Sequence, residues 1–167
     1  ITVQPVSPDL TPESYDPDLS HEDLLITKSS VESAVNNYDK IFSNALVIRT
    51  LPNEESKLSR KYIDNAPPFF SLEAIKAISE MGVEHLLVDI PSVDRTFDGG
   101  KLSVHHIFWD IEQGSHWVDK RNVSFKTITE MVYVPDNITD GEYLLNLQIA
   151  PFISDASPSR PLLFNIN

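Results

Sequence analysis

The sequence predicts a mixed α/β fold in which helices flank a mixed sheet. Two apolar runs of strand length, at residues 44–49 and 86–88, stand on either side of a segment whose apolar residues recur at helical spacing. Strand-like runs at 125–134, 143–150 and 162–166 then follow one another with no helix between them. Because consecutive strands joined by turns can pair in opposite directions, this late part predicts an antiparallel portion of the sheet.

The first forty residues combine short strand signals with a loop. Residues 1–6 alternate apolar and polar side chains, which predicts an edge strand. Residues 7–22 are rich in proline and acidic side chains and predict a loop. After a short apolar run, Ser29 or Ser30 can cap a helix that extends to about Tyr38.

The central elements carry clearer start and stop signals. Residues 50–70 are polar and charged, which predicts an excursion over the surface. Ser71 can cap the helix that follows, and Gly82 supplies its stop. Residues 101–110 have helix-compatible spacing and precede a polar loop at 111–121.

Composition limits both the size of the protein and the kind of partner. With 167 residues, 41% of them hydrophobic, the chain is long enough for one core and short for two, so we predict one domain over residues 1–167. The formal charge of −12 argues against a nucleic-acid or membrane surface and favours a small-molecule substrate or a protein partner. The chain has no cysteine, which excludes disulfides and thiolate metal sites. We expect a cytoplasmic rather than a periplasmic location.

The run that opens the chain already has the pattern of a strand, and its first residue is Ile1. We therefore expect that this chain is part of a longer protein, with a segment upstream of Ile1.

Polar side chains gather directly after the apolar run 86–88, where Asp89, Ser92 and Asp94 follow within six residues. A buried strand that ends in a polar loop is a common place for the chemistry of α/β proteins. A structural role is the alternative, since Asp89 could cap the turn at Ser92.

Two histidines and one glutamate are the further candidates. His105 and His106 are adjacent on the predicted helix and point about 100° apart, so at most one of them is expected to face a given site. Glu130 shares the face of its predicted strand with Ile128 and Val132, where a carboxylate is costly to bury unless it binds something. Histidine and carboxylate together are typical metal ligands. On the alternative interpretation, the histidines are satisfied or exposed polar residues and Glu130 lies on an edge strand with its face in water.

At these residues the sequence resembles the cyclase family of metal-dependent hydrolases, the group that includes bacterial kynurenine formamidase. Residues 82–94, Gly-Val-Glu-His-Leu-Leu-Val-Asp-Ile-Pro-Ser-Val-Asp, are similar to a strand and an Asp-x-Pro-Ser-Val-Asp loop of that family. His105 stands where the family has a histidine ligand. Residues 128–147 and 155–161 resemble its glutamate-containing strand and its Asp-Ala-Ser-Pro-x-Arg close.

The resemblance implies a swivelling β/β/α fold, a divalent metal that is usually zinc, and assembly into homodimers or homotetramers. His105 and Glu130 take the places of two ligands, whereas the family's His-x-Gly-Thr-His-x-Asp segment, which supplies the others, has no counterpart in this sequence. The family's further histidine, thought to act as acid and base, has none either. The resemblance also implies an insertion at 110–124.

Asp89, Ser92, Asp94 and His106 are expected to orient the site or to bind substrate. The function implied is metal-dependent hydrolysis of a formamide, a cyclic amide or a lactone. The alternative is an inactive binding or structural module of the same fold, because two ligands bind zinc weakly.

Overall fold

The computed structural model describes residues 1–36, 38, 44–63, 65–115, 117, 121 and 123–166. Its centre is a parallel four-stranded sheet with the order β1 (Thr2–Val3), β3 (Ala45–Thr50), β5 (His85–Val88), β6 (Thr127–Thr129). A second parallel pair is formed by β2 (Leu25–Ile26) and β4 (Phe69–Phe70), and an antiparallel pair by β7 (Tyr143–Asn146) and β8 (Leu162–Asn165). Two short 3₁₀ helices are η1 (Pro8–Leu10) and η3 (Glu55–Leu58).

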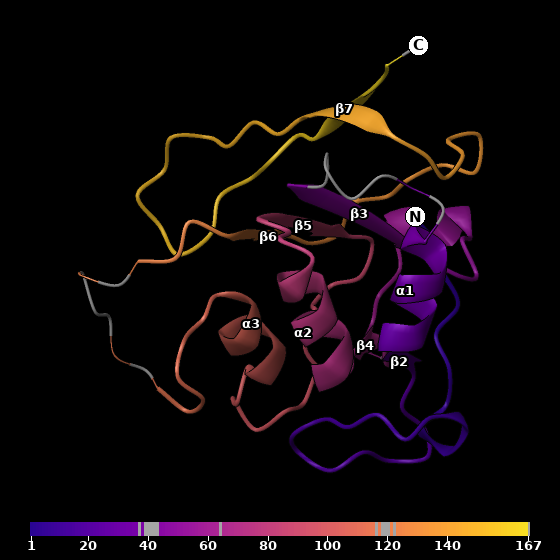
Figure 1. The fold of residues 1–167 in the computed structure, drawn as a ribbon, viewed down its shortest axis with the longest axis vertical. Coiled ribbons are helices and arrows are strands. Elements are labelled where there is room, and N and C mark those ends of the chain that lie inside the picture. Colours follow the sequence, from indigo (N-terminus) through magenta and orange to yellow (C-terminus); the bar gives the residue numbers. More distant parts are fainter. Residues whose placement is uncertain are drawn as a thin grey trace.

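The elements form three layers. Helices α1 (Lys28–Val35), α2 (Leu72–Glu80) and α3 (Ser103–Phe108) lie on one side of the four-stranded sheet, and the β7–β8 pair lies on the other (Figure 1). This arrangement agrees with the mixed α/β fold and the β/β/α layering that the sequence predicts.

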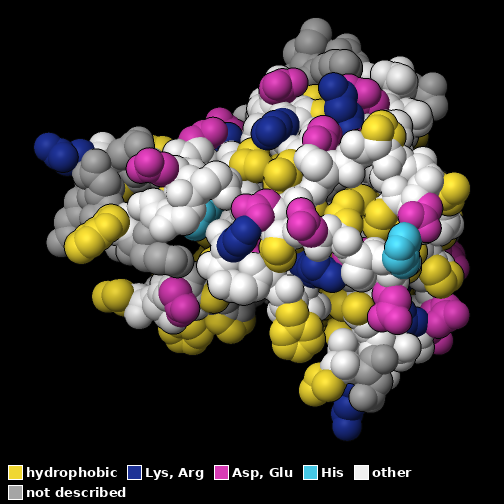
Figure 2. Space-filling view, turned by 90° about the horizontal axis from the view of Figure 1, so that it is seen from below, with side chains coloured by type: hydrophobic (Ala, Val, Ile, Leu, Met, Phe, Trp, Pro, Cys, Tyr) yellow, Lys and Arg dark blue, Asp and Glu magenta, His cyan; other side chains and the backbone are white. Residues whose placement is uncertain are grey.

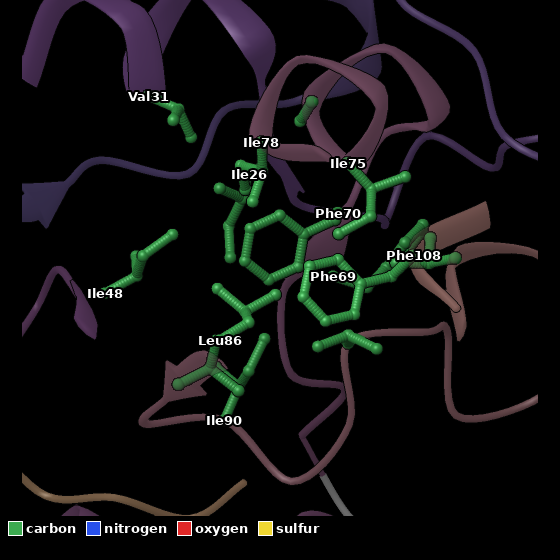
Figure 3. Close-up of a cluster of buried hydrophobic side chains, with 14 of the residues drawn as sticks. Ile26, Val31, Ile48, Phe69, Phe70, Ile75, Ile78, Leu86, Ile90 and Phe108 are labelled. Atoms are coloured by element: carbon green, nitrogen blue, oxygen red, sulfur yellow. The ribbon is translucent and has the colours of Figure 1, made fainter. Parts of the chain in front are cut away.

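The core lies between the sheet and the helices. Leu46 and Ile48 alternate with half-buried residues along β3, and both point into a layer of buried side chains. Figure 3 shows how the rings of Phe69 and Phe70 fill the centre of this layer, with Leu86 from β5 beside them. Burial of this apolar surface fixes the sheet against the helices and so fixes the strand ends that carry the site.

Local signals place α2 as the sequence predicts. The Ser71 hydroxyl accepts a hydrogen bond from the Ala74 amide at 3.0 Å, which caps the first turn. At the other end Gly82 has a φ of +83°, a conformation that side chains disfavour, and the helix stops there. The strand pair β3–β5 on either side of α2 is in register from Ala45 opposite His85 to Ile48 opposite Val88.

Several predictions differ from the structure. The strands expected over 1–6 and 143–150 are reduced to β1 and β7, and the surface excursion expected over 50–70 ends in the buried strand β4 because Phe69 and Phe70 pack into the core.

Two further boundaries are wrong. The first is the start of α1, which Thr27 caps in place of Ser29 or Ser30; its hydroxyl accepts from the Ser30 amide at 3.2 Å, and the helix ends at Val35. Both serines lie inside the helix because Thr27 already has the extended backbone that a cap requires.

The second is the strand expected over 125–134, which is reduced to β6 and pairs in parallel with β5. It ends early because Met131 has a φ of 62°, which takes the chain out of the strand. The antiparallel prediction is confirmed for β7 and β8. Of the expected insertion at 110–124, residues 116, 118–120 and 122 lie outside the described residues.

The opposite face of the sheet is less completely covered. A mainly apolar cavity of about 710 Å³ lies between β3 and the β7–β8 pair, with Val47, Tyr143, Leu145 and Leu163 among its walls. None of the six side chains predicted for the site lines it. Within the part of the chain that the structure describes, no helix is long and apolar enough to cross a membrane.

Acidic and basic side chains are interspersed on the surface. In the view of Figure 2, lysines and arginines lie among aspartates and glutamates, with apolar side chains between them.

Candidate functional site

The site lies where the parallel strands end. Strands β3, β5 and β6 run in the same direction, so their carboxyl ends meet at one edge of the sheet. Thr50 ends β3, Asp89 follows β5 and Glu130 follows β6. Glu130 is therefore one residue beyond its strand, and the predicted strand face with Ile128 and Val132 does not form because β6 stops at Thr129.

His105, in the first turn of α3, connects two carboxylates. Its Nδ1 lies 2.7 Å from Oδ2 of Asp94, and its Nε2 lies 3.5 Å from Oε1 of Glu130. The side chains of His105 and Glu130 are 14% and 29% exposed, whereas that of Asp94 is 1% exposed. The imidazole thus contacts the buried Asp94 through Nδ1 and the partly exposed Glu130 through Nε2.

Asp94 is held by a complete set of donors. Oδ1 accepts from the Tyr15 hydroxyl and from the Val104 amide, both at 2.8 Å. Oδ2 accepts from the His105 amide at 3.1 Å in addition to the ring. A carboxylate has about four acceptor positions, and all four are used. Asp94 can therefore fix both the start of α3 and the orientation of the imidazole.

The hydrogen bonds also set the charges of this group. Burial raises the pKa of Asp94, but the hydrogen bonds from His105 and from the Val104 amide outweigh burial and hold that pKa below its usual range. Burial lowers the pKa of His105, but its hydrogen bonds to Asp94 and Glu130 outweigh that effect and raise the pKa from 6.5 to about 9. A pKa of about 9 favours the protonated imidazole at neutral pH when no metal is bound.

The loop after β5 supports the site through its backbone. The Ser92 hydroxyl accepts from the Asp94 amide at 3.1 Å, and the Val93 amide donates to Oε1 of Glu130 at 3.1 Å. Ser92 thus acts on the loop that carries Asp94, and the same loop holds Glu130 toward His105.

Left-handed backbone conformations lie next to the site. Leu102 precedes α3 with a φ of 49°, Asp110 follows it with a φ of 58°, and Met131 follows Glu130 with a φ of 62°. For residues other than glycine such a conformation costs about 1–2 kcal/mol. Strain of this kind concentrates at functional sites, where the surroundings impose a geometry.

His106 does not share the site with His105. Its side chain is buried and 6% exposed, and its Nδ1 has no hydrogen-bond partner among the described residues. The prediction that the two adjacent histidines face different surroundings agrees with this geometry. No described contact gives His106 a role in orienting the site.

Asp89 belongs to a separate cluster at the same sheet edge. It accepts from the Thr50 amide at 2.8 Å, from the Thr50 hydroxyl at 2.9 Å and from Nζ of Lys57 at 2.7 Å. The side chains of Asp89 and Lys57 are 1% and 5% exposed. Asp89 therefore does not cap the turn at Ser92 as the alternative had it; it joins β3 to β5 and neutralises a buried cation.

The donor atoms can be compared with the demands of a metal ion. In a tetrahedral zinc site with bonds of about 2.0–2.1 Å, neighbouring ligand atoms are about 3.3–3.4 Å apart. The separation of 3.5 Å between Nε2 of His105 and Oε1 of Glu130 fits two ligands of one ion. Asp94 on the other ring nitrogen completes the carboxylate–histidine arrangement that accompanies metal sites.

The described residues contain no group of three or more histidine, aspartate or glutamate side chains arranged around one ion position. His105 and Glu130 thus fit part of a metal site, and further ligands are needed to complete it.

Two buried residues at this edge of the sheet could not be predicted from the sequence. Tyr15 lies in the region predicted as a loop, and Lys57 in the predicted surface excursion, yet both are buried against aspartates of the sheet edge. Their local patterns contain no signal for this placement, because each contact joins residues at least 32 positions apart.

The family model named Cyclase matches residues 9–95, which is more than half of the chain. The chain belongs to the Cyclase family. The matched segment contains Tyr15 and Asp94, which lie behind His105, and the separate pair of Lys57 and Asp89. No curated protein sequence matches the chain.

Solved structures share the fold of this Cyclase family chain. A potential metal-dependent hydrolase with cyclase activity is 17% identical, with a TM-score of 0.57, over 90% of this chain and 62% of that chain. A predicted metal-dependent hydrolase from Bacillus stearothermophilus is 15% identical, with a TM-score of 0.53, over 96% of this chain and 63% of that chain. The chain therefore spans less than two thirds of the length of these structures.

Proposed function

We propose that this Cyclase family chain forms part of a metal-dependent hydrolase that cleaves a formamide, a cyclic amide or a lactone. The names of the two solved structures support metal-dependent hydrolysis at a coarse level. The observation that carries the proposal is the pair formed by Nε2 of His105 and Oε1 of Glu130, 3.5 Å apart, with the buried Asp94 behind the ring.

In this proposal His105 and Glu130 hold a divalent metal, with zinc the expected ion. Such an ion, when bound, lowers the pKa of a coordinated water from 15.7 to about 7 and polarises a carbonyl. Asp94 keeps the imidazole oriented, and the Val93 amide keeps Glu130 oriented. The remaining ligands and the acid/base group come from outside the described residues.

As a ligand of such an ion, His105 would have to release the proton on Nε2. With its pKa raised to about 9, the ring is protonated at neutral pH in the metal-free protein. His105 would therefore hold such an ion more weakly as the pH falls, because a ligand imidazole must be without its Nε2 proton.

The test is a metal titration of Glu130→Gln. Glutamine keeps an oxygen for the Val93 amide but removes the charge that a metal attracts. We expect zinc affinity, measured by calorimetry, to fall by about tenfold or more. The matched control is Glu32→Gln, since Glu32 is half exposed on α1 and pairs only with Lys28 among the described ion pairs. Equal affinity of Glu130→Gln and the unaltered chain would contradict the assignment.

Hydrolysis needs a separate assay. An aryl formamide, a cyclic amide and a lactone are offered to the protein with and without zinc, and turnover that requires zinc supports the enzyme proposal. Zinc binding without turnover of any of them would favour the second candidate, a binding or structural module. That candidate is supported by the small number of ligands, since the described residues offer only two at one position.

We also propose that the protein assembles into homodimers or homotetramers. Leu144 and Phe164 on the β7–β8 pair are 62% and 48% exposed, which supports an apolar contact between copies. Light scattering after gel filtration tests this, and a monomer at micromolar concentration would contradict it.

A further inference from the structure

The indole ring of Trp109 packs against the imidazole of His105. The ring centroids are 5.0 Å apart and the two ring planes are inclined by 57°. The two residues are four positions apart, one within α3 and one directly after it, a spacing that places both side chains on the same face of the helix. Trp109 is partly buried and also packs against the hydrophobic core. The imidazole therefore contacts a ring that is itself held by the rest of the protein.

The end of α3 fixes the backbone of Trp109. Asp110, the next residue, has a left-handed φ of 58°. Its amide donates to the Ile107 carbonyl at 3.3 Å, and the Ile111 amide donates to the His106 carbonyl at 2.8 Å. This pair of hydrogen bonds around a left-handed residue is a Schellman motif, which satisfies the last carbonyls of a helix. Trp109 is thus held where the helix ends, and the direction of its side chain is defined.

The polar contacts of His105 leave its ring some freedom. Nδ1 lies 2.7 Å from Oδ2 of Asp94, which fixes the position of that nitrogen. Nε2 lies 3.5 Å from Oε1 of Glu130, longer than the usual range of about 2.7–3.2 Å for a hydrogen bond from nitrogen. One short hydrogen bond at Nδ1 allows the ring to rock about that end, and rocking moves Nε2. The indole limits this motion because it occupies the space into which the ring would tilt.

We propose that Trp109 is a positioning residue: by packing against the imidazole it restricts the motion of His105 and keeps Nε2 close to Oε1 of Glu130. This inference rests on the proposed function for its purpose, since the position of Nε2 matters only if a metal binds. The restriction itself comes from packing, and it can be measured without any metal.

The experiment is a ¹³C relaxation measurement on the histidine rings of the metal-free 167-residue chain, with every variant at the same pH. In the unaltered chain we expect a His105 ring order parameter of about 0.85, and a value below about 0.6 for His21, whose side chain is 89% exposed. Trp109→Leu keeps an apolar side chain but removes the planar ring. In this variant the order parameter of His105 should fall below about 0.6.

Three control variants separate positioning from a general loss of stability. Trp117→Leu removes the other tryptophan, which is 91% exposed, and should leave His105 unchanged. Ile107→Ala removes apolar packing from the same helix and should lower stability without loosening the His105 ring. Trp109→Phe restores a planar ring and should recover most of the lost order. The proposal is overturned if Trp109→Leu leaves His105 as ordered as Trp117→Leu does, or if Ile107→Ala loosens it equally.

Zinc affinity provides a second readout. Trp109→Leu is expected to reduce it by about tenfold, the lower end of the effect of partners that orient ligands. A fall in order with unchanged affinity would overturn the proposal. If the unaltered chain binds no zinc but Trp109→Leu loosens His105, the proposed function fails and the restriction by Trp109 stands. If zinc binding depends on Glu130 and the order of His105 does not change, the function stands and the positioning role fails.

Should Trp109→Leu fail to fold, Trp109→Met replaces it. The unbranched side chain of methionine adapts to irregular spaces in a core but offers no planar ring. The same fall in the His105 order parameter supports the proposal, and an unchanged value overturns it.

Discussion

Two buried aspartates at the same edge of the sheet have opposite surroundings. Asp89 is neutralised inside the protein by Lys57, 2.7 Å away, and both side chains are at most 5% exposed. Asp94 contacts His105, whose other nitrogen faces a second carboxylate on a partly open side. The first cluster holds a lysine, which offers no ligand atom, whereas the second holds an imidazole, which can release a proton and offer Nε2 to an ion. Burial of a carboxylate alone therefore does not identify a site. What distinguishes the two aspartates is the residue that each contacts, and whether that residue faces a further ligand atom.

The largest effect is expected from a substitution that breaks the Asp89 cluster. Lys57→Met removes the cation and leaves Asp89 buried with only Thr50 as partner, which should lower the free energy of unfolding by about 3–5 kcal/mol. Urea denaturation followed by circular dichroism measures this loss. Lys61→Met, at an exposed lysine, is the matched control and should change stability little. A stable Lys57→Met protein would show that the pair is not structural.

The next effect concerns the Asp94 cluster. Asp94→Asn removes the charge behind His105, and we expect zinc affinity to fall by about 10–100-fold. Calorimetric titration measures the affinity. In the same experiment Asp89→Asn should lose stability but retain zinc affinity in the fraction that stays folded, and equal losses of affinity in both variants would remove the distinction between the clusters.

The pH dependence of stability tests the surroundings of His105 in the Asp94 cluster. The folded-state pKa of His105 lies at about 9, above its unfolded value near 6.5, so its contribution is fully present below pH 6.5 and is lost as the pH rises through 9. For the metal-free chain we expect a loss of about 3 kcal/mol over this range, measured by urea denaturation. His105→Gln should flatten this part of the profile. An unchanged profile in that variant would assign the pH dependence to another group.

The smallest effect tests the loop between the clusters. Ser92→Ala removes the hydroxyl that accepts from the Asp94 amide, and we expect a loss of about 0.5–1 kcal/mol in the free energy of unfolding. Zinc affinity should be nearly unchanged, because the Asp94 side chain keeps its four donors. A large loss of affinity would mean that Ser92 acts on the site directly.

Much of the fold could be predicted because local signals and final structure agree. Ser71 caps α2 and Gly82 ends it, as their positions in the sequence indicate. The direction of β6 could not be predicted, since its pairing with β5 depends on a strand edge that only the folded sheet provides. The cap of α1 was misplaced because three hydroxyl residues compete within four positions and only the backbone conformation of Thr27 decides.

The residues of the candidate site could be named from the sequence, but the contacts among them could not. His105, Asp94 and Glu130 are brought together by the ends of different elements, and their role in metal binding stays a prediction. Tyr15 and Lys57 were missed because polar residues in loop-like sequence give no sign of burial. Their placement depends on partners at 79 and 32 positions along the chain.

The most direct test of the distinction between the clusters is an anomalous-scattering map at the zinc absorption edge from crystals of the protein grown with zinc. The account predicts a peak about 2.0–2.2 Å from both Nε2 of His105 and Oε1 of Glu130, and no peak at Asp89. The exposed pair His21 and Asp9, 3.2 Å apart, serves as an internal reference for adventitious binding. A map with zinc only at such surface pairs, and none between His105 and Glu130, would contradict the central claim.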